Sequence, residues 1–439
     1  MFRLGVALTL VSPLIAADWP MFMYNLEHHS FNRAESVLNS RTVSRLLPAW
    51  TMEFNDKFAS APVIDAGRLY VGGWSGRFYA LNADTGQLIW SSFVGISPSP
   101  EDPACAMPLG VTGSPVVKGD TVYVPGGDSR VYALNKSDGK IQWSVGIADP
   151  RAGAYIWSSL MLEGNRIHVG IASLGDCPLV PGAVVTIDLD QPLDPTFTYL
   201  TPDEDTVGAG VWSSPAVDTK SKKMFLTTGT GEQDAEMGLW GGTFLKLDSA
   251  TLKVEAHYFL PTNNAETDIE WGSSPVAFQN AAGVPLVAAS GKDGILYTLR
   301  QSDLSVLWTR QIAIGCICPE CGCGSLSTPA FDGTTLYTGA GAAEDADLEG
   351  GTVYALDPGT GKVLWRQLLE GTVIAPVTVA KGMVYVSTMR GVEIFDSASG
   401  ERLWRSNKNG IVYSQPVVCN GTLYSTFLDG SIIAFRPDP

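Results

Sequence analysis

The stretch that decides the fold is YALNADTGQLIW at residues 79–90, because close copies of it recur along the chain. Residues 132–143 read YALNKSDGKIQW, and residues 354–365 read YALDPGTGKVLW. Weaker copies lie around residues 297–308 and 394–404. Each copy alternates apolar and polar residues. Each also contains a turn in which Asp occurs together with either Gly or Ser. This pattern is typical of half-buried strands joined by tight hairpins.

A second signal, a small residue and a proline before an apolar run, precedes each copy. These starts lie at Pro62, Pro115, Leu160 (a degenerate copy), Pro215, Pro275, Pro329, Pro376 and Pro416. The first and last starts are 354 residues apart, which gives seven intervals of roughly 51 residues. Four short strands per period of this size predict a β-propeller blade. We therefore expect an all-β fold, an eight-bladed β-propeller, with residues 18–439 forming a single domain.

The two ends of this repeat array are complementary. The last repeat lacks its fourth strand and its tryptophan, whereas Trp50 belongs to no repeat of its own. Trp50 precedes Pro62 by 12 residues, the same gap as between Trp404 and Pro416. The pattern predicts that the N-terminal segment, residues 18–50, supplies the outer strand of blade eight and closes the ring, which removes exposed sheet edges.

Composition restricts the partners and the location. The 45 acidic and 29 basic residues give a formal charge of −16, which repels phosphate backbones and argues against nucleic-acid binding. Residues 1–17 combine one Arg, an apolar run and small residues before Asp18, as in a secretory signal peptide; a buried N-terminal strand is the alternative reading. No later stretch reaches the ~20 apolar residues of a membrane span. We expect the mature protein in the periplasm or outside the cell.

Beside the repeats, three stretches carry a family resemblance. They are the N-terminal pattern from Asp18-Trp19 through Phe31 to Leu46, VWSSPAVD at 211–218, and GTG at 229–231. The chain resembles the quinoprotein alcohol dehydrogenases that bind pyrroloquinoline quinone (PQQ), especially the polyvinyl-alcohol dehydrogenases, over nearly all of residues 18–439. The resemblance implies an alcohol substrate, PQQ and Ca²⁺. It also implies a separate electron acceptor such as a cytochrome c, because the chain has no CxxCH motif for covalent haem.

Strand parity predicts which face carries function. In a four-stranded blade, the connection between the second and third strands emerges on the same face as the connection to the next blade. The long connections nearly all belong to these two classes; they are 93–113, 172–182, 199–212, 229–242, 261–273, 310–328 and 339–351. Long loops on one face of a rigid scaffold are where binding and catalysis concentrate.

Charged and aromatic residues gather in these loops. The charged candidates are Asp176, Glu232, Asp268, Glu270 and Lys292, and the aromatic ones are Trp157, Trp212 and Trp271. Carboxylates suit a hard cation such as Ca²⁺, and flat rings at the channel mouth suit a planar quinone. The alternative is that the carboxylates are simply solvated on an acidic protein and that the tryptophans pack in the core.

The resemblance assigns a role to each candidate. It implies metal ligation by Asp176, Glu232 and Asp268, a catalytic base at Asp268 or Glu270, and cofactor contacts from Lys292, Trp157, Trp212 and Trp271. The chain also departs from the family, which usually has Glu where Asp176 stands and Asn where Glu232 stands. The adjacent cysteine pair of many members is absent. These departures leave open an altered or a lost PQQ site.

Four of the seven cysteines form C-x-C-x-x-C-x-C at residues 316–323, between the fifth and sixth blades. Structural zinc sites usually use two separated CxxC pairs, so in an exported chain we expect one or two disulfides here, without metal. Cys105 and Cys177 are candidates for another pair, and Cys419 is the candidate free thiol.

Two functions follow from these patterns. The first is an exported alcohol dehydrogenase that depends on PQQ and Ca²⁺. The second is a cofactor-free propeller that binds protein or polymer on the long-loop face, because such scaffolds share the same repeats.

Overall fold

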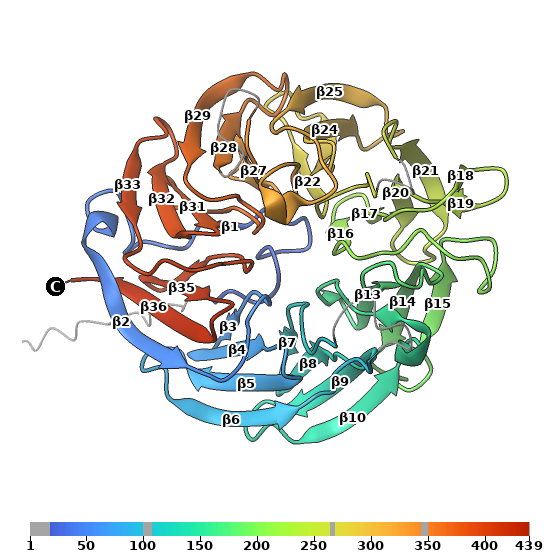
Figure 1. Ribbon diagram of the computed structural model, residues 1–439, viewed down its shortest axis with the longest axis horizontal. Coiled ribbons are helices and arrows are strands. Elements are labelled where there is room, and N and C mark those ends of the chain that lie inside the picture. The colour runs from blue at the N-terminus through green and yellow to red at the C-terminus, as the bar shows by residue number, and fades with distance from the viewer. Residues whose placement is uncertain (1–17, 100–107, 264–267, 344–349, 439) are drawn as a thin grey trace, which may run out of the picture.

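The computed structural model describes residues 18–99, 108–263, 268–343 and 350–438. Eight antiparallel blades surround a central axis (Figure 1), which confirms the predicted eight-bladed propeller. The predicted signal segment, residues 1–17, and Cys105 lie outside the described residues. No helix in the described ranges is long and apolar enough to cross a membrane.

Within each blade the strands follow one another outward from the axis. Blade 1 contains β3 (Val63–Asp65), β4 (Arg68–Gly72), β5 (Arg77–Asn82) and β6 (Leu88–Phe93). Blade 2 contains β7 (Val116–Lys118), β8 (Thr121–Pro125), β9 (Arg130–Asn135) and β10 (Ile141–Gly146). Blade 3 contains β12 (Met161–Glu163), β13 (Arg166–Ser173), β14 (Ala183–Asp188) and β15 (Thr196–Tyr199), with β11 (Ala154–Tyr155) added to β13. Blade 4 contains β16 (Ala216–Asp218), β17 (Lys223–Thr227), β20 (Thr243–Asp248) and β21 (Val254–Phe259), with the hairpin β18 (Gln233–Asp234) and β19 (Leu239–Trp240) inserted.

The second half of the ring repeats this arrangement. Blade 5 contains β22 (Val276–Gln279), β23 (Pro285–Ser290), β24 (Ile295–Arg300) and β25 (Val306–Gln311). Blade 6 contains β26 (Ala330–Phe331), β27 (Leu336–Ala340), β28 (Gly351–Leu356) and β29 (Val363–Leu369). Blade 7 contains β30 (Thr378–Ala380), β31 (Met383–Thr388), β32 (Gly391–Asp396) and β33 (Arg402–Arg405), with β1 (Phe31–Asn32) beside β30. Blade 8 contains β34 (Val417–Cys419), β35 (Thr422–Thr426), β36 (Ser431–Pro437) and β2 (Leu46–Glu53). The short 3-10 turns are η1 (Val43–Arg45), η2 (Pro150–Ala152) and η3 (Pro319–Cys321).

Ring closure follows the predicted route. Strand β2 pairs antiparallel with β36, and Trp50 lies opposite Ala434. The closing strand therefore comes from the opposite end of the sequence to the other three strands of blade 8.

Tryptophans of the outer strands join neighbouring blades. Trp50 Nε1 donates a hydrogen bond to the Ala83 carbonyl in the turn of blade 1, at 3.0 Å. A Cβ added to Gly86 in the same turn would lie 2.6 Å from the Trp50 ring, so only glycine leaves room for it. Trp90 and Gly139 repeat this contact one blade further on. This packing explains why the repeat couples a turn glycine with a tryptophan.

A belt of hydroxyl groups links the inner ends of blades 2 to 6. The residue two positions before each innermost strand donates its backbone N–H to the hydroxyl oxygen of the corresponding residue on the next blade. The successive pairs are Ser114 to Ser159 (3.0 Å), Ser159 to Ser214 (2.9 Å), Ser214 to Ser274 (2.9 Å) and Ser274 to Thr328 (3.1 Å). The belt holds these inner ends in a regular ring around the channel.

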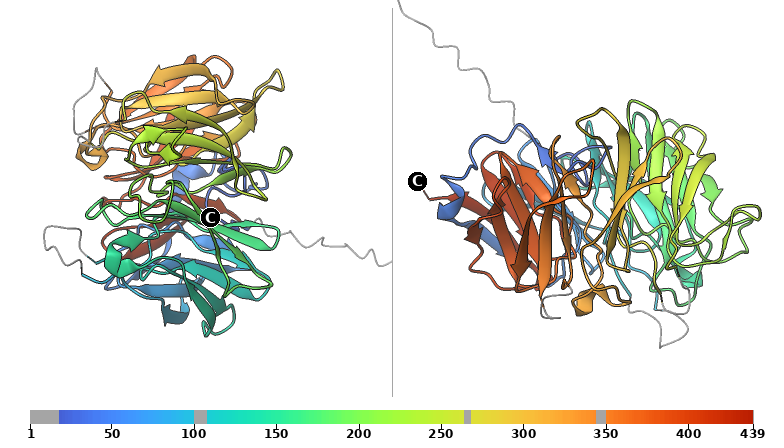
Figure 2. Two further views of the ribbon diagram at one scale, coloured as in Figure 1. Left: turned by 90° about the vertical axis from the view of Figure 1, so that its right-hand side faces the viewer. Right: turned by 90° about the horizontal axis from the view of Figure 1, so that it is seen from above.

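A plug segment, residues 19–35, crosses the channel on the side of the short turns. Its backbone bonds to five innermost strands, through Trp19 with Ile64, Leu26 with Val217, Glu27 with Ala277, His29 with Phe331, and Ser30 with Val379. Figure 2 shows this blue segment on one side of the disc and the orange turn η3 on the other. The plug segment therefore spans the channel on the side opposite the loop-bearing face.

Candidate functional site

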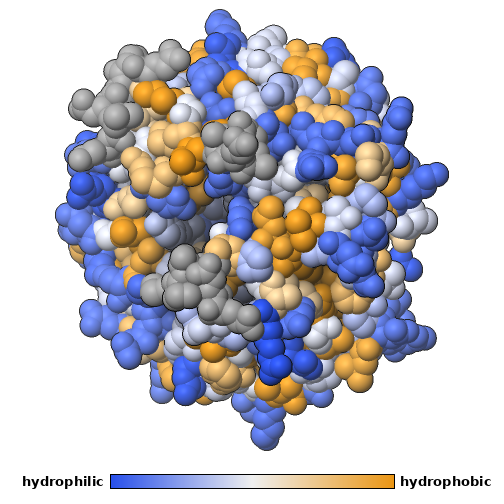
Figure 3. All heavy atoms as spheres, turned by 45° about the vertical axis from the view of Figure 1, so that its right-hand side comes forward, coloured by the Kyte–Doolittle hydropathy of each residue, from blue (hydrophilic) through white to orange (hydrophobic). Residues whose placement is uncertain are grey.

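The channel contains a cavity of about 520 Å³, within the ~300–1,000 Å³ range of small-molecule sites. Phe22 of the plug segment and Gln415 of blade 8 line it together with residues of the long loops. Gln415 Oε1 also accepts a hydrogen bond from the Met23 backbone N–H, at 3.1 Å. In the space-filling view, the loop-bearing face is hollowed (Figure 3).

Four charged residues form a carboxylate–lysine cluster on one wall of this cavity: Asp176, Asp268, Glu270 and Lys292. One oxygen from each carboxylate lies within 4.8 Å of the other two. Lys292 Nζ lies 2.8 Å from Asp268 Oδ2 and 2.8 Å from Glu270 Oε1. Among the described residues that line the cavity, Lys292 has the only basic side chain.

Main-chain contacts fix this cluster in place. Trp271 and Gly291 form an isolated antiparallel bridge, and the Lys292 N–H donates to the Glu270 carbonyl at 2.9 Å. The segments that carry Glu270 and Lys292 are thus bonded side by side.

A glycine-rich stretch receives the Glu270 carboxylate. The Thr230 N–H donates to Glu270 Oε2 at 2.6 Å, and a Cβ on Gly229 would lie 2.7 Å from the same oxygen. The GTG sequence at 229–231 therefore supplies both a donor and the room that the carboxylate needs.

Burial shifts the protonation equilibria in the cluster. Desolvation raises the pKa of Glu270 to about 7, although the charge of Lys292 works in the opposite direction. For Lys292, burial lowers the pKa, but the adjacent Glu270 and Asp268 outweigh it and the net direction is upward. Desolvation and the charge of Asp268 raise the pKa of Asp176. Lys292 therefore stays protonated near neutral pH, while Glu270 is poised to change charge there.

The two acidic residues near Lys292 differ in access. The Glu270 side chain is 5% exposed and its oxygens are occupied by Lys292 and Thr230, whereas the Asp268 side chain is 43% exposed. Of these two carboxylates, Asp268 is the one that a molecule in the cavity can reach.

Two of the expected tryptophans line the cavity. Trp212 is half-buried, and the centre of its ring lies 5.9 Å from Lys292 Nζ. Trp157 is also half-buried and donates its Nε1–H to the Ser173 carbonyl at 2.9 Å. The cavity therefore has flat aromatic walls beside its charged wall.

The expected positions of Trp271 and Glu232 are corrected by the structure. Trp271 is 1% exposed and packs edge-on against Phe244 and Tyr297 in the core between blades 4 and 5, away from the cavity. Glu232 is exposed at the base of the β18–β19 hairpin, which folds back on itself, and it is not part of the cluster. Glu270 takes the third carboxylate position instead, together with Asp176 and Asp268.

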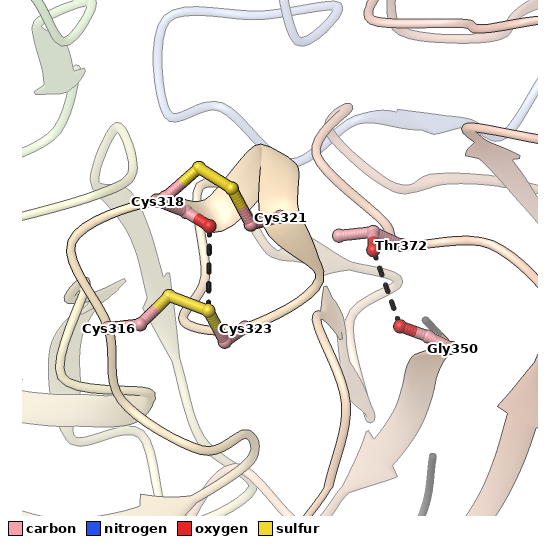
Figure 4. Close-up of a disulfide and its surroundings, with 6 residues drawn as sticks. All are labelled: Cys316, Cys318, Cys321, Cys323, Gly350 and Thr372. Atoms are coloured by element: carbon pink, nitrogen blue, oxygen red, sulfur yellow. Dashed lines mark hydrogen bonds between the residues drawn. A yellow bond between two sulfur atoms is a disulfide. The ribbon is translucent and has the colours of Figure 1, made fainter. Parts of the chain in front are cut away.

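The expected oxidation of the cysteine loop, residues 316–323, is confirmed by two nested disulfides. Cys316 pairs with Cys323, and Cys318 pairs with Cys321 (Figure 4). Cys419 is the buried free thiol, as predicted. Cys177 is disulfide-bonded, and its proposed partner lies outside the described residues.

Sequence reasoning missed several residues that line the cavity. Phe22 and Gln415 reach it through the plug segment and blade 8, and Ile317, Pro319 and Glu320 reach it from the cysteine loop. The cysteine spacing indicated a rigid loop on this face, but no pattern indicated that its tip borders the charged wall.

The donor set suits a hard cation. Three carboxylates offer oxygen ligands within a small volume, which is what Ca²⁺ prefers. Asp268 Oδ1 is buried and has no hydrogen-bond partner among the described residues, so it is available as a ligand atom. The aromatic walls and Lys292 suit a planar, anionic quinone such as PQQ.

Known proteins resemble this chain along most of its length. A family model described as outer membrane protein assembly factor BamB (PQQ_2) matches residues 48–171 and 292–438, more than half of the chain. The polyvinylalcohol dehydrogenase of Sphingopyxis sp. (strain 113P3) is 22% identical over 400 residues, which cover 80% of this chain and 59% of that protein. The quinoprotein ethanol dehydrogenase of Pseudomonas putida is 34% identical over 122 residues, 27% of this chain and 19% of that protein. The chain thus spans less than two thirds of either relative.

Solved structures share the architecture. A europium-containing methanol dehydrogenase superposes with a TM-score of 0.79 at 15% identity, over 96% of this chain and 98% of that one. A likeness at this identity establishes the fold.

Proposed function

Because the chain belongs to the PQQ_2 family, we propose that it is a quinoprotein alcohol dehydrogenase that works with PQQ and a cation, Ca²⁺. The observation that carries the proposal is the carboxylate–lysine cluster beside Trp212, in the wall of the channel cavity. A purely structural ion pair would need neither the cavity nor the unpartnered Asp268 oxygen.

Asp268 is the proposed catalytic base. Its side chain is 43% exposed and lines the cavity, and its Oδ2 lies 2.8 Å from Lys292 Nζ. As a carboxylate it accepts the proton of the substrate hydroxyl. Bound PQQ would supply the acceptor for the hydride from the carbinol carbon.

Glu270 is proposed as a positioning residue and a metal ligand. It holds Lys292 at 2.8 Å and is itself held by the Thr230 N–H. With Asp176 and Asp268 it would bind the cation. The ammonium of Lys292 would face an oxygen of the quinone, above the Trp212 ring.

Charge balance makes the cation part of the proposal. The described lining carries four carboxylates, Asp176, Asp268, Glu270 and Glu320, against the single ammonium of Lys292. PQQ has three carboxylates of its own, and like charges this close repel strongly. A bound cation offsets this repulsion, so the quinone is expected to enter with the metal or after it.

The location and the electron acceptor belong to the same proposal. Residues 1–17 would direct export. Cys177 is disulfide-bonded, Cys316 pairs with Cys323 and Cys318 pairs with Cys321, and disulfides suit an oxidising compartment. Electrons would leave to a separate carrier such as a cytochrome c.

The second candidate is a scaffold that binds protein or polymer on the loop-bearing face, and the family description favours it. Reconstitution separates the two: the purified chain is mixed with PQQ and CaCl₂, and quenching of tryptophan fluorescence and dye-coupled oxidation of several alcohols are measured. Quinone binding that requires Ca²⁺, followed by turnover, supports the enzyme. If the chain neither binds PQQ nor oxidises any of the alcohols, the result supports the scaffold.

A further inference from the structure

The cysteine loop, residues 316–323, holds an apolar side chain in solvent. Ile317 is 57% exposed, and it stands between Cys316 and Cys318, which belong to different disulfides (Figure 4). Exposing an isoleucine is unfavourable by roughly 25 cal/mol per Å² of apolar surface. A loop cross-linked twice cannot easily rearrange to bury it.

The loop is anchored to the wall that carries the charged cluster. The Cys316 N–H donates to the Lys292 carbonyl at 2.9 Å. On its other side, the Gly322 carbonyl accepts from the Ala342 N–H at 2.7 Å, in the loop of blade 6. The position of Ile317 is therefore fixed relative to Lys292.

Ile317 is one of several apolar side chains at the cavity. The half-buried apolar and aromatic residues contributed by the other loops are Leu109, Leu179, Leu326, Ile374 and Tyr413. Outside the cluster wall and Glu320, most polar side chains of the lining are already hydrogen-bonded within the protein: hydroxyls of the belt accept backbone N–H groups, and Ser173, Ser213 and Gln415 have partners of their own. The rest of the lining suits a hydrocarbon surface better than a polyhydroxylated one.

We infer that Ile317 is a specificity-determining residue that contacts the hydrocarbon part of the substrate, remote from its hydroxyl. The substrate class is then alcohols with an extended apolar chain, rather than sugars. Glu320 borders the same cavity from the same loop and disfavours alcohols that carry a carboxylate. The identification of the ligand as a substrate rests on the proposed function, but its binding does not.

The test measures binding without turnover. Ethanol and 1-octanol are each titrated against the purified chain, with the tryptophan fluorescence from Trp157 and Trp212 as the signal. The wild type is compared with Ile317→Ser and with the control Ile141→Ser, an exposed isoleucine (49%) on the outer strand β10. Ile317→Ser should weaken octanol binding about 3- to 10-fold, because serine removes most of the apolar surface that the isoleucine side chain offers to the alkyl chain. Ethanol binding by Ile317→Ser and octanol binding by Ile141→Ser should stay unchanged.

The outcomes separate this inference from the proposed function. Octanol binding that is absent from the wild type, or equal in wild type and Ile317→Ser, would overturn the inference. If binding depends on Ile317 but no alcohol is oxidised with PQQ and CaCl₂, the inference stands and the dehydrogenase proposal fails. If oxidation occurs, the KM for octanol should rise in Ile317→Ser while kcat for ethanol stays constant.

Discussion

Lys292 Nζ lies 2.8 Å from Glu270 Oε1, and both side chains are nearly withdrawn from solvent, at 10% and 5% exposure. A buried ion pair of this kind is costly to break, because removing one partner leaves the other charge unpaired in a medium of low polarity. The pair therefore fixes the two side chains in place at the cavity wall, and the titration of Glu270 should be visible in the stability of the whole chain.

Glu270 should make the free energy of unfolding depend on pH. Burial raises the pKa of its carboxyl from an ordinary value of 4.5 to about 7. Between these values the folded chain holds a proton that the unfolded chain has released, so stability should fall as pH rises from about 4.5 to 7. Urea unfolding from pH 5 to 7.5 should show wild type losing stability relative to Glu270→Gln. Parallel curves for the two proteins would contradict the assignment.

Asp268→Asn should abolish alcohol oxidation in the reconstituted protein, because an amide cannot accept the hydroxyl proton. Loss of a general base typically costs about 10²- to 10⁴-fold in rate. Quenching of tryptophan fluorescence by PQQ should persist, which would separate chemistry from binding. Glu232→Gln is the matched control: Glu232 is exposed and outside the cluster, so its activity should equal that of wild type. Retained activity in Asp268→Asn would show that a group other than Asp268 is the general base.

Gly86→Ala should destabilise the ring at the junction of blades 8 and 1. Gly86 has a φ of 73°, and a Cβ there would lie 2.6 Å from the Trp50 ring. We expect a loss of about 2–4 kcal/mol, from left-handed strain and overpacking together. Gly67 has a φ of 76° with nothing within 4 Å of its Cβ position, so Gly67→Ala should lose only about 1–2 kcal/mol. Equal midpoints in chemical denaturation would show that the Trp50 contact contributes nothing.

The four cysteines of the loop at 316–323 should give no reaction with a thiol reagent after denaturation without reductant, because they form two disulfides. Cys419 should react only after denaturation, since it is fully buried and burial raises the pKa of its thiol. Labelling followed by peptide mapping identifies each position. Reaction at Cys318 or Cys321 under these conditions would mean that the inner disulfide is not formed in the protein as isolated.

Deleting residues 18–50 should prevent the chain from folding. The deletion removes most of β2 from blade 8 and the whole plug segment that bonds to the innermost strands. A deletion of residues 1–17 alone is the control and should fold like the full chain. Circular dichroism and gel filtration would distinguish them, and a cooperative melt of the longer deletion would show that closure by β2 is dispensable.

The sequence predicted the ring because every blade repeats the same pattern and the orphan Trp50 matches the spacing at the other end. The sequence wrongly placed Trp271 at the cavity, and the number of residues between each tryptophan and the inner strand explains why. Trp157 and Trp212 each stand three residues before the first residue of the inner run, Leu160 and Pro215, whereas Trp271 stands four before Pro275. Successive side chains of an extended segment point to opposite sides.

The same alternation explains why Glu270 belongs to the site. Asp268, Glu270 and Gly272 are two residues apart and all line the cavity, so Trp271 between them must face the core. Glu232 could not be placed in this way, because it begins a hairpin that pairs with itself. The direction in which such an insertion leaves its blade depends on contacts that no local pattern encodes.

Because Trp50 pairs with Ala434, the ring can be completed only after the ribosome has synthesised β36 near the end of the chain. A ribosome adds about 5–20 residues per second, so β2 leaves it roughly 20–80 s before its partner β36 exists. During that interval β2 is a free strand with an apolar face, which other chains can pair with. Pro48 within β2 lacks an N–H and therefore removes one donor from any such pairing. Folding yield should therefore respond to the rate of translation and to chaperones that shield residues 46–53, even in variants whose finished ring is as stable as that of wild type.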